Sequence, residues 1–187
     1  MDIEIGKGKT ARRAYGLDEI AIVPSRRTRD AEDIDISWSL GDLELELPCM
    51  ASALDAAVDP KTAGIIGQLG GLAVLNLEGI QTRYEDPDSI FEEVANLPQE
   101  KATRVMQELY QEPIKEELVF RRVQQIKDQG VIAAASLTPQ RVEKYHRAAL
   151  EAGLDLLVIQ GTVVSAEHVS KTTTPLNLME FIPSLNV

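Results

Sequence analysis

Polar residues follow each of four short apolar runs in this sequence, and their side chains are the ones that could bind a ligand. They are Ser52 and Asp55 after the first run, Asn76 at the end of the second, Ser136 at the end of the third, and Gln160, Gly161 and Thr162 after the fourth. If the runs are parallel strands of a barrel, their carboxyl ends meet at one mouth, where barrel folds assemble their active sites. The spacing therefore predicts that these residues face one rim.

Cys49 is the single cysteine of the chain, so it is the residue to consider as a covalent nucleophile. It lies in an apolar run between Pro48 and Met50, and we expect a small buried side chain there. His146 lies on a polar helix and His168 in a charged loop, without the spacing of metal ligands. We therefore expect neither a nucleophile nor a metal site among these residues.

The best-defined part of the sequence, residues 45–76, predicts a strand, a helix and a second strand. Asp59 and Pro60 fit the N-cap and the first position of the helix. The pair Gly70–Gly71 fits its end, because glycine accepts the left-handed conformation that ends a helix. The apolar runs on either side have strand length, so a parallel βαβ unit is predicted.

Further strands follow after a helical stretch. Residues 77–130 contain three amphipathic segments and no convincing strand, which predicts a helical crossover. Residues 131–137 and 154–160 are expected to be strands. The helix between them is expected to have Thr138 as its N-cap and Gly153 as its end.

The N-terminal segment is expected to contain little regular structure. GKGKT at residues 6–10 is not a phosphate-binding P-loop, because Ile3 stands where the first glycine is required. We expect residues 1–18 to be irregular and residues 19–24 to form a short strand. The alternation of leucines over residues 43–47 indicates a half-buried strand.

The composition excludes several classes of protein. The chain has 187 residues, 44% of them hydrophobic, which is enough for one well-buried domain. A net charge of -11 disfavours a nucleic-acid partner. The longest apolar runs are far shorter than the roughly 20 residues that cross a bilayer. The N-terminus lacks an apolar signal region, and one cysteine fits a reducing compartment, so we expect a cytoplasmic protein.

The alternation of strands and helices fits either a small doubly wound sheet or part of a (β/α)8 barrel. No GxGxxG follows the first strand, which disfavours a dinucleotide-binding Rossmann domain. The segment MASALDAAVD, followed by a helix, a Gly-Gly pair and a strand that ends in Asn76, resembles the first βαβ unit of the IMP dehydrogenase/GMP reductase family. GKGKTARRAYGLDEIAIVPSRRT, LEGIQTRYEDP and QELYQEPIK carry the same resemblance.

The resemblance is closest to the compact IMP dehydrogenase-related branch without CBS domains, which includes cyanobacterial GMP reductases. It implies an α/β fold, the N-terminal half of a TIM (β/α)8 barrel with about four parallel strands and flanking helices. A single domain is then expected over residues 1–187, with an arm at 1–44. The first four βα units would occupy residues 45–187, with a helical insertion at about 77–130.

The resemblance also implies a purine nucleotide oxidoreductase that converts GMP to IMP and ammonia with NADPH. The reaction would pass through a covalent thioether at C2 of the purine. The family's catalytic cysteine belongs to a loop beyond residue 187, so no catalytic residue is expected within this chain, and the chain alone should be inactive. The expected partners are a purine nucleotide and further copies of the chain, with no nucleic acid and no membrane.

Particular residues can be carried over from the family. Ser52, Leu54 and Asp55 match the loop that lines the purine nucleotide site, with Leu54 in place of a common methionine. Gln160, Gly161 and Thr162 match a turn that approaches the nicotinamide ribose, with Gln160 in place of an aspartate. The alternatives are NAD-dependent oxidation of IMP to XMP and a truncated remnant without catalysis.

Overall fold

The structure is a computed structural model that describes residues 2–23, 26–161 and 176–185. It separates into two compact units, Met1–Asp35 and Ile36–Val187. The candidate site lies within the second unit, which contains the parallel sheet and its helices. The single domain expected over residues 1–187 stays a prediction.

The N-terminal unit begins with a hairpin. Strands β1 (Asp2–Gly6) and β2 (Lys9–Arg12) pair antiparallel. Gly8 in the connecting turn has a φ of +72°, a conformation that favours glycine. The expectation of irregular structure over residues 1–18 was therefore wrong for residues 2–12, because Gly6, Lys9 and Thr10 of GKGKT lie in the paired strands and Lys7 and Gly8 form the turn.

The strand expected at residues 19–24 was also wrong. Glu19 ends the 3-10 helix η1 (Leu17–Glu19), and residues 20–23 have no regular structure. Ile22 is fully exposed and has no pairing strand among the described residues. An apolar run forms a strand only where another strand accepts its hydrogen bonds. A second 3-10 helix, η2 (Ala31–Asp33), ends the unit.

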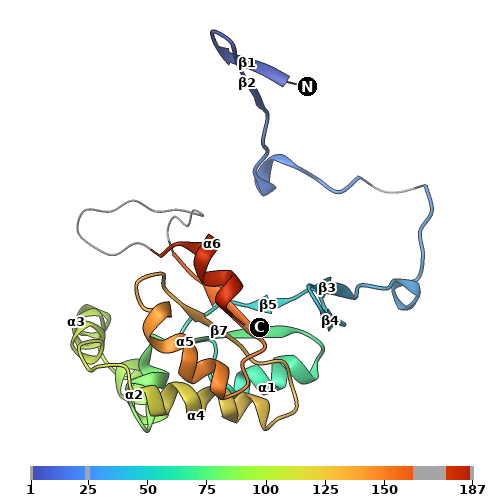
Figure 1. Cartoon of the computed structure of the whole chain (residues 1–187). Helices are drawn as coiled ribbons and strands as arrows, with labels where there is room; N and C mark the ends of the chain where they lie inside the picture. Colours follow the sequence, from blue (N-terminus) through green and yellow to red (C-terminus); the bar gives the residue numbers. More distant parts are fainter. Residues whose placement is uncertain (1, 24–25, 162–175, 186–187) are drawn as a thin grey trace. The chain divides into compact units, whose positions relative to one another are not determined.

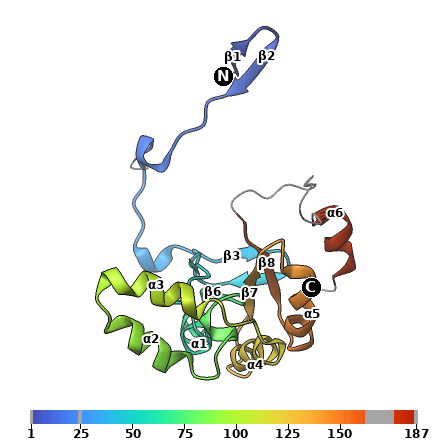
Figure 2. The same cartoon turned by 90° about the vertical axis from the view of Figure 1, so that its left-hand side faces the viewer.

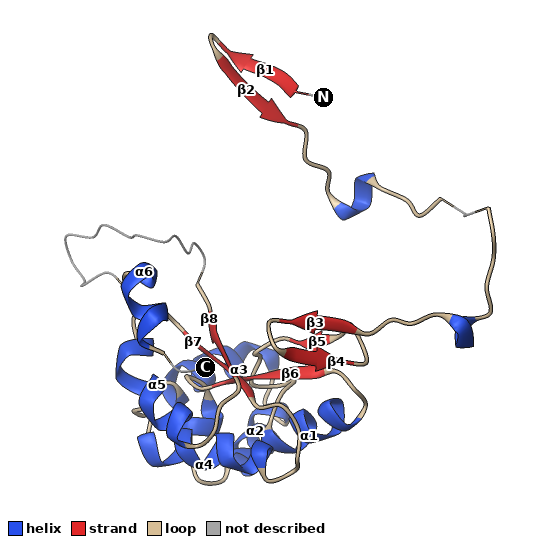
Figure 3. Cartoon of the chain, turned by 45° about the vertical axis from the view of Figure 1, so that its right-hand side comes forward, coloured by secondary structure: helices blue, strands red, loops and turns tan. Residues whose placement is uncertain are grey.

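The second unit opens with another hairpin. Strands β3 (Trp38–Leu40) and β4 (Leu43–Leu45) pair antiparallel around Gly41, which has a φ of +60°. The indole Nε1 of Trp38 donates to the carbonyl oxygen of Leu47 at 3.0 Å. That bond fixes the hairpin to the segment that enters the main sheet. Figure 3 shows the β3–β4 hairpin and the strands of that sheet.

The main sheet has four parallel strands in sequential order. They are β5 (Met50–Ala51), β6 (Leu72–Asn76), β7 (Ala134–Leu137) and β8 (Leu156–Ile159). Each strand pairs in parallel with the next. The predicted fold class is confirmed, because sequential parallel strands with helical crossovers are the arrangement of half of a (β/α)8 barrel.

Helices connect and flank these strands. They are α1 (Pro60–Gln68), α2 (Pro87–Ala95), α3 (Gln99–Leu109), α4 (Glu116–Lys127), α5 (Val142–Glu151) and α6 (Leu178–Phe181), with short 3-10 helices η3 (Ile80–Thr82) and η4 (Ile182–Ser184). Helices α1, α4 and α5 lie side by side against one face of the sheet (Figures 1 and 2). The predicted start of α1 is confirmed, since the Asp59 carboxylate accepts the N–H of Thr62 at 2.6 Å.

Helix α5 begins later than predicted. Its N-cap is Arg141, and the carbonyl oxygen of Thr138 accepts the N–H groups of Arg141 and Val142 in a turn. The N–H of Thr138 donates to the carboxylate of Glu78, which lies in the loop after β6. The cap predicted at Thr138 was therefore wrong: the N-cap position is Arg141, without a side-chain cap bond, and Thr138 is held instead by the long-range carboxylate of Glu78.

The sheet has two apolar faces. Ala73, Leu75 and Ala135 pack with the helices in the larger core. Their neighbours Leu72, Val74 and Ala134 form a second cluster with Leu45 and Trp38 of the hairpin. Successive strand residues alternate between faces, so one side of the sheet packs on helices and the other meets the β3–β4 hairpin.

Cys49 is exposed, so the prediction of a buried side chain was wrong. It precedes β5, which has only two residues and is an outer strand of the sheet. A short edge strand has one neighbour and covers its side chains incompletely.

Within the described residues, no helix combines the length and apolar character that membrane crossing requires.

We predict that the chain self-associates. Among the described residues, no strand pairs with the outer side of β5 or β8, and Met50 on β5 is 44% exposed. Unpaired edges invite pairing with another chain. Light scattering after size-exclusion chromatography should show a mass that rises with concentration. The substitution Met50→Lys should reduce association, whereas Leu69→Lys, equally apolar but at the end of α1, should not. A monomer of 20.6 kDa at all concentrations would contradict the prediction.

Candidate functional site

An open cavity of about 640 Å³ lies at the carboxyl ends of the four parallel strands. Residues that end or follow each strand contribute to it, together with residues from the loop after β6. The lining comprises Ala53, Asn76, Glu78, Arg83, Tyr110, Thr138, Arg141, Gln160 and Gly161. This rim is where barrel folds build ligand sites, because the strand-to-helix loops converge there.

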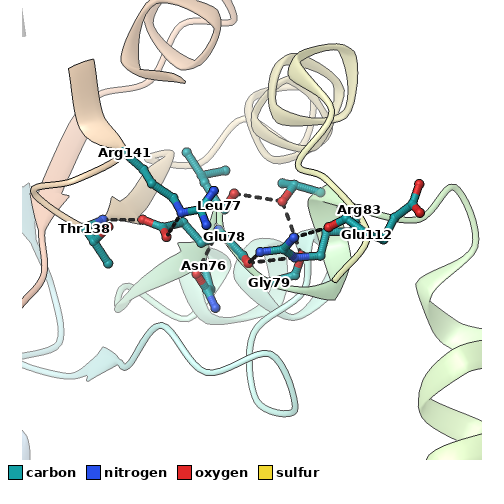
Figure 4. A network of polar contacts seen from close by, with 9 residues as sticks. Asn76, Leu77, Glu78, Gly79, Arg83, Glu112, Thr138 and Arg141 are labelled. Carbon is teal, nitrogen blue, oxygen red and sulfur yellow. Dashed lines mark hydrogen bonds and ion pairs between the residues drawn. The ribbon is translucent and has the colours of Figure 1, made fainter. Parts of the chain in front are cut away.

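Glu78 connects two loops of the rim (Figure 4). One carboxylate oxygen accepts the backbone N–H of Thr138, and the other pairs with Nε of Arg141 at 3.1 Å. The Glu78 side chain is 15% exposed, whereas that of Arg141 is 46% exposed. The carboxylate thereby holds the loop after β6 against the loop after β7, and the guanidinium of Arg141 remains accessible to a ligand.

Arg83 is buried and fastens the other side of the same loop. Its guanidinium donates to the carbonyl oxygen of Glu78 at 3.1 and 2.9 Å and to the carbonyl oxygen of Glu112 (Figure 4). Thr82 adds a bond from its hydroxyl to the carbonyl oxygen of Leu77 at 2.8 Å. These contacts tie the end of β6 to the segment that leads into α4.

Arg122 of helix α4 also donates hydrogen bonds to backbone carbonyl oxygens that follow β6. Its guanidinium donates to the carbonyl oxygens of Gln81, Tyr84 and Glu85 at 2.9, 3.1 and 2.9 Å. Burial lowers the pKa of Arg122, since removal from water disfavours the charged form. The carbonyl dipoles around the guanidinium offset that loss of hydration.

Asp55 accepts three hydrogen bonds from different elements. Its Oδ1 accepts from Nδ2 of Asn76 at 2.9 Å, and its Oδ2 accepts from the N–H of Ile80 at 2.7 Å and the hydroxyl of Tyr110 at 2.5 Å. Burial raises the pKa of Tyr110, and the bond to Asp55 raises it further because that bond favours the protonated phenol.

The structure brings together part of the predicted site. Asn76, Gln160 and Gly161 line the cavity. Asp55 lines a neighbouring cavity of about 400 Å³. It accepts hydrogen bonds from Asn76 and Tyr110, which both line the larger cavity. Thr162 lies outside the described residues.

The other predicted residues do not line this cavity. Ser52 and Leu54 are exposed, and the carbonyl oxygen of Ser52 accepts the N–H of Leu54 in a tight turn. Ser136 is buried and bonds the backbone of Leu77 with its carbonyl oxygen. The assignment of Ser52 and Leu54 to nucleotide binding stays a prediction.

Sequence reasoning missed Glu78, Arg83, Tyr110 and Arg141. Glu78 follows the predicted strand by two residues, so a search slightly further past the strand end would have found it. Arg141 was assigned to a helix that begins later. Tyr110 comes from the helical insertion, and no local signal relates it to the strands. Across the described ranges, no cluster of three or more metal-ligating side chains occurs.

No family model matches the chain. It is 43% identical over 190 residues to uncharacterized oxidoreductases from Mycobacterium tuberculosis and Mycobacterium leprae, with 99% of this chain and 51% of each relative aligned. The crystal structure of an IMP dehydrogenase/GMP reductase-like protein from Corynebacterium glutamicum matches with a TM-score of 0.85 and 42% identity. That match covers 100% of this chain and 50% of the other.

These similarities support the assignment of the chain to the IMP dehydrogenase/GMP reductase superfamily. A segment of 66 residues, 35% of this chain, is also 32% identical to inosine-5'-monophosphate dehydrogenase of Methanocaldococcus jannaschii, of which it covers 13%. The chain spans about half the length of the curated relatives it matches. The resemblance found in the sequence is thus confirmed at the level of the superfamily.

We predict that Arg122→Met destabilises the fold by about 2 kcal/mol or more, because three carbonyl oxygens lose a buried donor. Arg121→Met is the matched control. Arg121 is the adjacent residue, half exposed and paired with Glu85, so its loss should cost less than about 1 kcal/mol. Urea unfolding measures the loss of stability in both variants. Equal losses would contradict the role of Arg122 as a buried donor to these carbonyl oxygens.

A second prediction follows from the raised pKa of Tyr110. The folded protein keeps this phenol protonated above the pKa of an unfolded tyrosine, about 10. The contribution of the Tyr110 phenol to the free energy of unfolding is therefore complete below that pH and is lost as pH rises toward the pKa of the folded state. The difference in unfolding free energy between the natural protein and Tyr110→Phe should shrink from about pH 8 to about pH 11. A constant difference would argue against the buried, Asp55-bonded phenol.

Proposed function

We propose that this chain provides one half of the barrel of a purine nucleotide oxidoreductase that converts GMP to IMP and ammonia with NADPH. The observation that carries the proposal is the match over the whole chain, at 42% identity, to an IMP dehydrogenase/GMP reductase-like protein. The oxidoreductase names of the mycobacterial relatives support the same class of reaction.

The cavity supports a nucleotide ligand by the chemistry of its lining. Arg141 presents a half-exposed guanidinium, and guanidinium groups bind phosphate and carbonyl oxygens. Asn76 offers amide hydrogen-bonding groups at the same rim. We propose that these groups, with the loop that contains Ser52, Leu54 and Asp55, bind and orient the purine nucleotide.

The residues that follow β8 are the ones we propose for the nicotinamide cofactor. Gln160 is exposed at the cavity, and its side chain can both donate to and accept from ribose hydroxyls. We propose that Gln160, Gly161 and Thr162 hold the ribose of NADPH, which supplies a hydride to the purine. Gln160 is neutral, so it orients the cofactor without taking or giving a proton at this position.

The chain's own contribution is a rigid rim. Glu78 joins the loops after β6 and β7, and Arg83 joins the first of them to the segment before α4. Fixed loops hold two ligands in the relative orientation that transfer between them requires.

NAD-dependent oxidation of IMP to XMP is the alternative, and the match of 66 residues to an IMP dehydrogenase favours it.

A direct assay tests the proposal. We expect the 187-residue chain alone to show no turnover with GMP and NADPH or with IMP and NAD, because loss of a covalent nucleophile removes several orders of magnitude of rate. A protein extended to the length of the relatives should consume NADPH, measured by absorbance, when GMP is present.

Heat-denatured protein is the control for both assays. Turnover by the chain alone would contradict the expected absence of a catalytic residue. Formation of NADH from IMP and NAD by the extended protein, without oxidation of NADPH by GMP, would replace the reductase by the dehydrogenase.

A further inference from the structure

Tyr110 joins the helical insertion to the rim of the barrel strands. It follows α3, and its hydroxyl donates to Asp55, which lies 55 positions earlier in the chain. The guanidinium carbon of Arg83 lies 5.2 Å from the centre of its ring, within the range of a cation–π contact. Tyr110 also lines the cavity, so its position shapes the site directly.

The Asp55 carboxylate is held in one place. Besides the hydroxyl of Tyr110, it accepts the amide of Asn76 and the N–H of Ile80. A Cβ atom added to Gly79 would lie only 1.7 Å from Oδ1 of Asp55. The carboxylate thus occupies space that only a glycine leaves open, and it cannot take this position beside a larger residue.

Asn76 is oriented by the same contacts. Its Nδ2 donates to Asp55, and its Oδ1 accepts the N–H of Glu78 at 3.0 Å. Both ends of the amide are therefore fixed, and the side chain cannot reverse without loss of both bonds. Asn76 and Glu78 both line the cavity. The bond from Tyr110 to Asp55 therefore affects the position of a side chain in the cavity wall.

We propose that Tyr110 is a positioning residue: through its bond to Asp55 it fixes the orientation of Asn76 in the wall of the nucleotide cavity. The consequence for ligand binding rests on the proposed function. The helical insertion is then a part of the site, because the residue that follows α3 completes the set of donors around Asp55.

The test uses two tyrosines that anchor the same segment. Tyr110→Phe removes the bond to Asp55 and keeps the ring beside Arg83. Tyr84→Phe is the matched control, since it removes a hydroxyl bond to the carbonyl oxygen of Leu109 at the end of the same helix. Gly79→Ala is an independent variant, because the added methyl group displaces the Asp55 carboxylate.

The first measurement is hydrogen exchange of the Ile80 amide in the 187-residue chain, since that N–H is bonded to Asp55. Loss of one donor should make its exchange about tenfold faster in Tyr110→Phe and in Gly79→Ala. Exchange in Tyr84→Phe should stay at the level of the natural chain. Unchanged exchange in Tyr110→Phe, or an equal increase in Tyr84→Phe, would overturn the proposal.

The second measurement is the affinity for GMP, by calorimetric titration of the protein extended to the length of the relatives. It should fall about fivefold to tenfold in Tyr110→Phe and in Gly79→Ala but not in Tyr84→Phe. Faster exchange with unchanged affinity would overturn the role in positioning. If the unsubstituted protein binds no GMP, the proposed function fails, and the exchange of Ile80 decides separately whether Tyr110 fixes Asp55.

Discussion

The backbone carbonyl oxygens of the loop after β6 are the groups on which the rest of the site depends. Two buried guanidiniums, Arg83 from the loop itself and Arg122 from α4, donate five hydrogen bonds to four carbonyl oxygens within residues 78–85. A buried loop whose carbonyl oxygens lacked donors would be costly, since each unpaired polar group loses its hydration. The arginines therefore allow an irregular segment to pack against the helices and to present Glu78 at the rim.

The sheet imposes the second constraint. Parallel strands in sequential order bring their carboxyl ends to one rim, and this collects residues from four distant parts of the chain around one cavity. The helices cover one face of the sheet, and the β3–β4 hairpin covers part of the other. The outer strands β5 and β8 have no second partner within the described residues, which leaves apolar groups such as Met50 accessible.

The helical insertion and the barrel loops form one polar system. Tyr110 links the insertion to Asp55, Asp55 links to Asn76, and Glu78 links onward to Arg141. The insertion contributes Tyr110 to the lining of the cavity, although it is separate from the strands in sequence.

Local signals in the sequence determined the elements whose ends depend on neighbouring residues. Asp59 caps α1, Gly70 ends it with a φ of +85°, and the apolar run after it forms β6, because caps and glycine conformations act within one turn. The family resemblance supplied the barrel. Only the tertiary structure decided the exposure of Cys49 beside an edge strand and the role of Glu78, whose carboxylate joins the loop after β6 to the loop after β7. These features depend on contacts between residues far apart in the chain, to which local patterns do not respond.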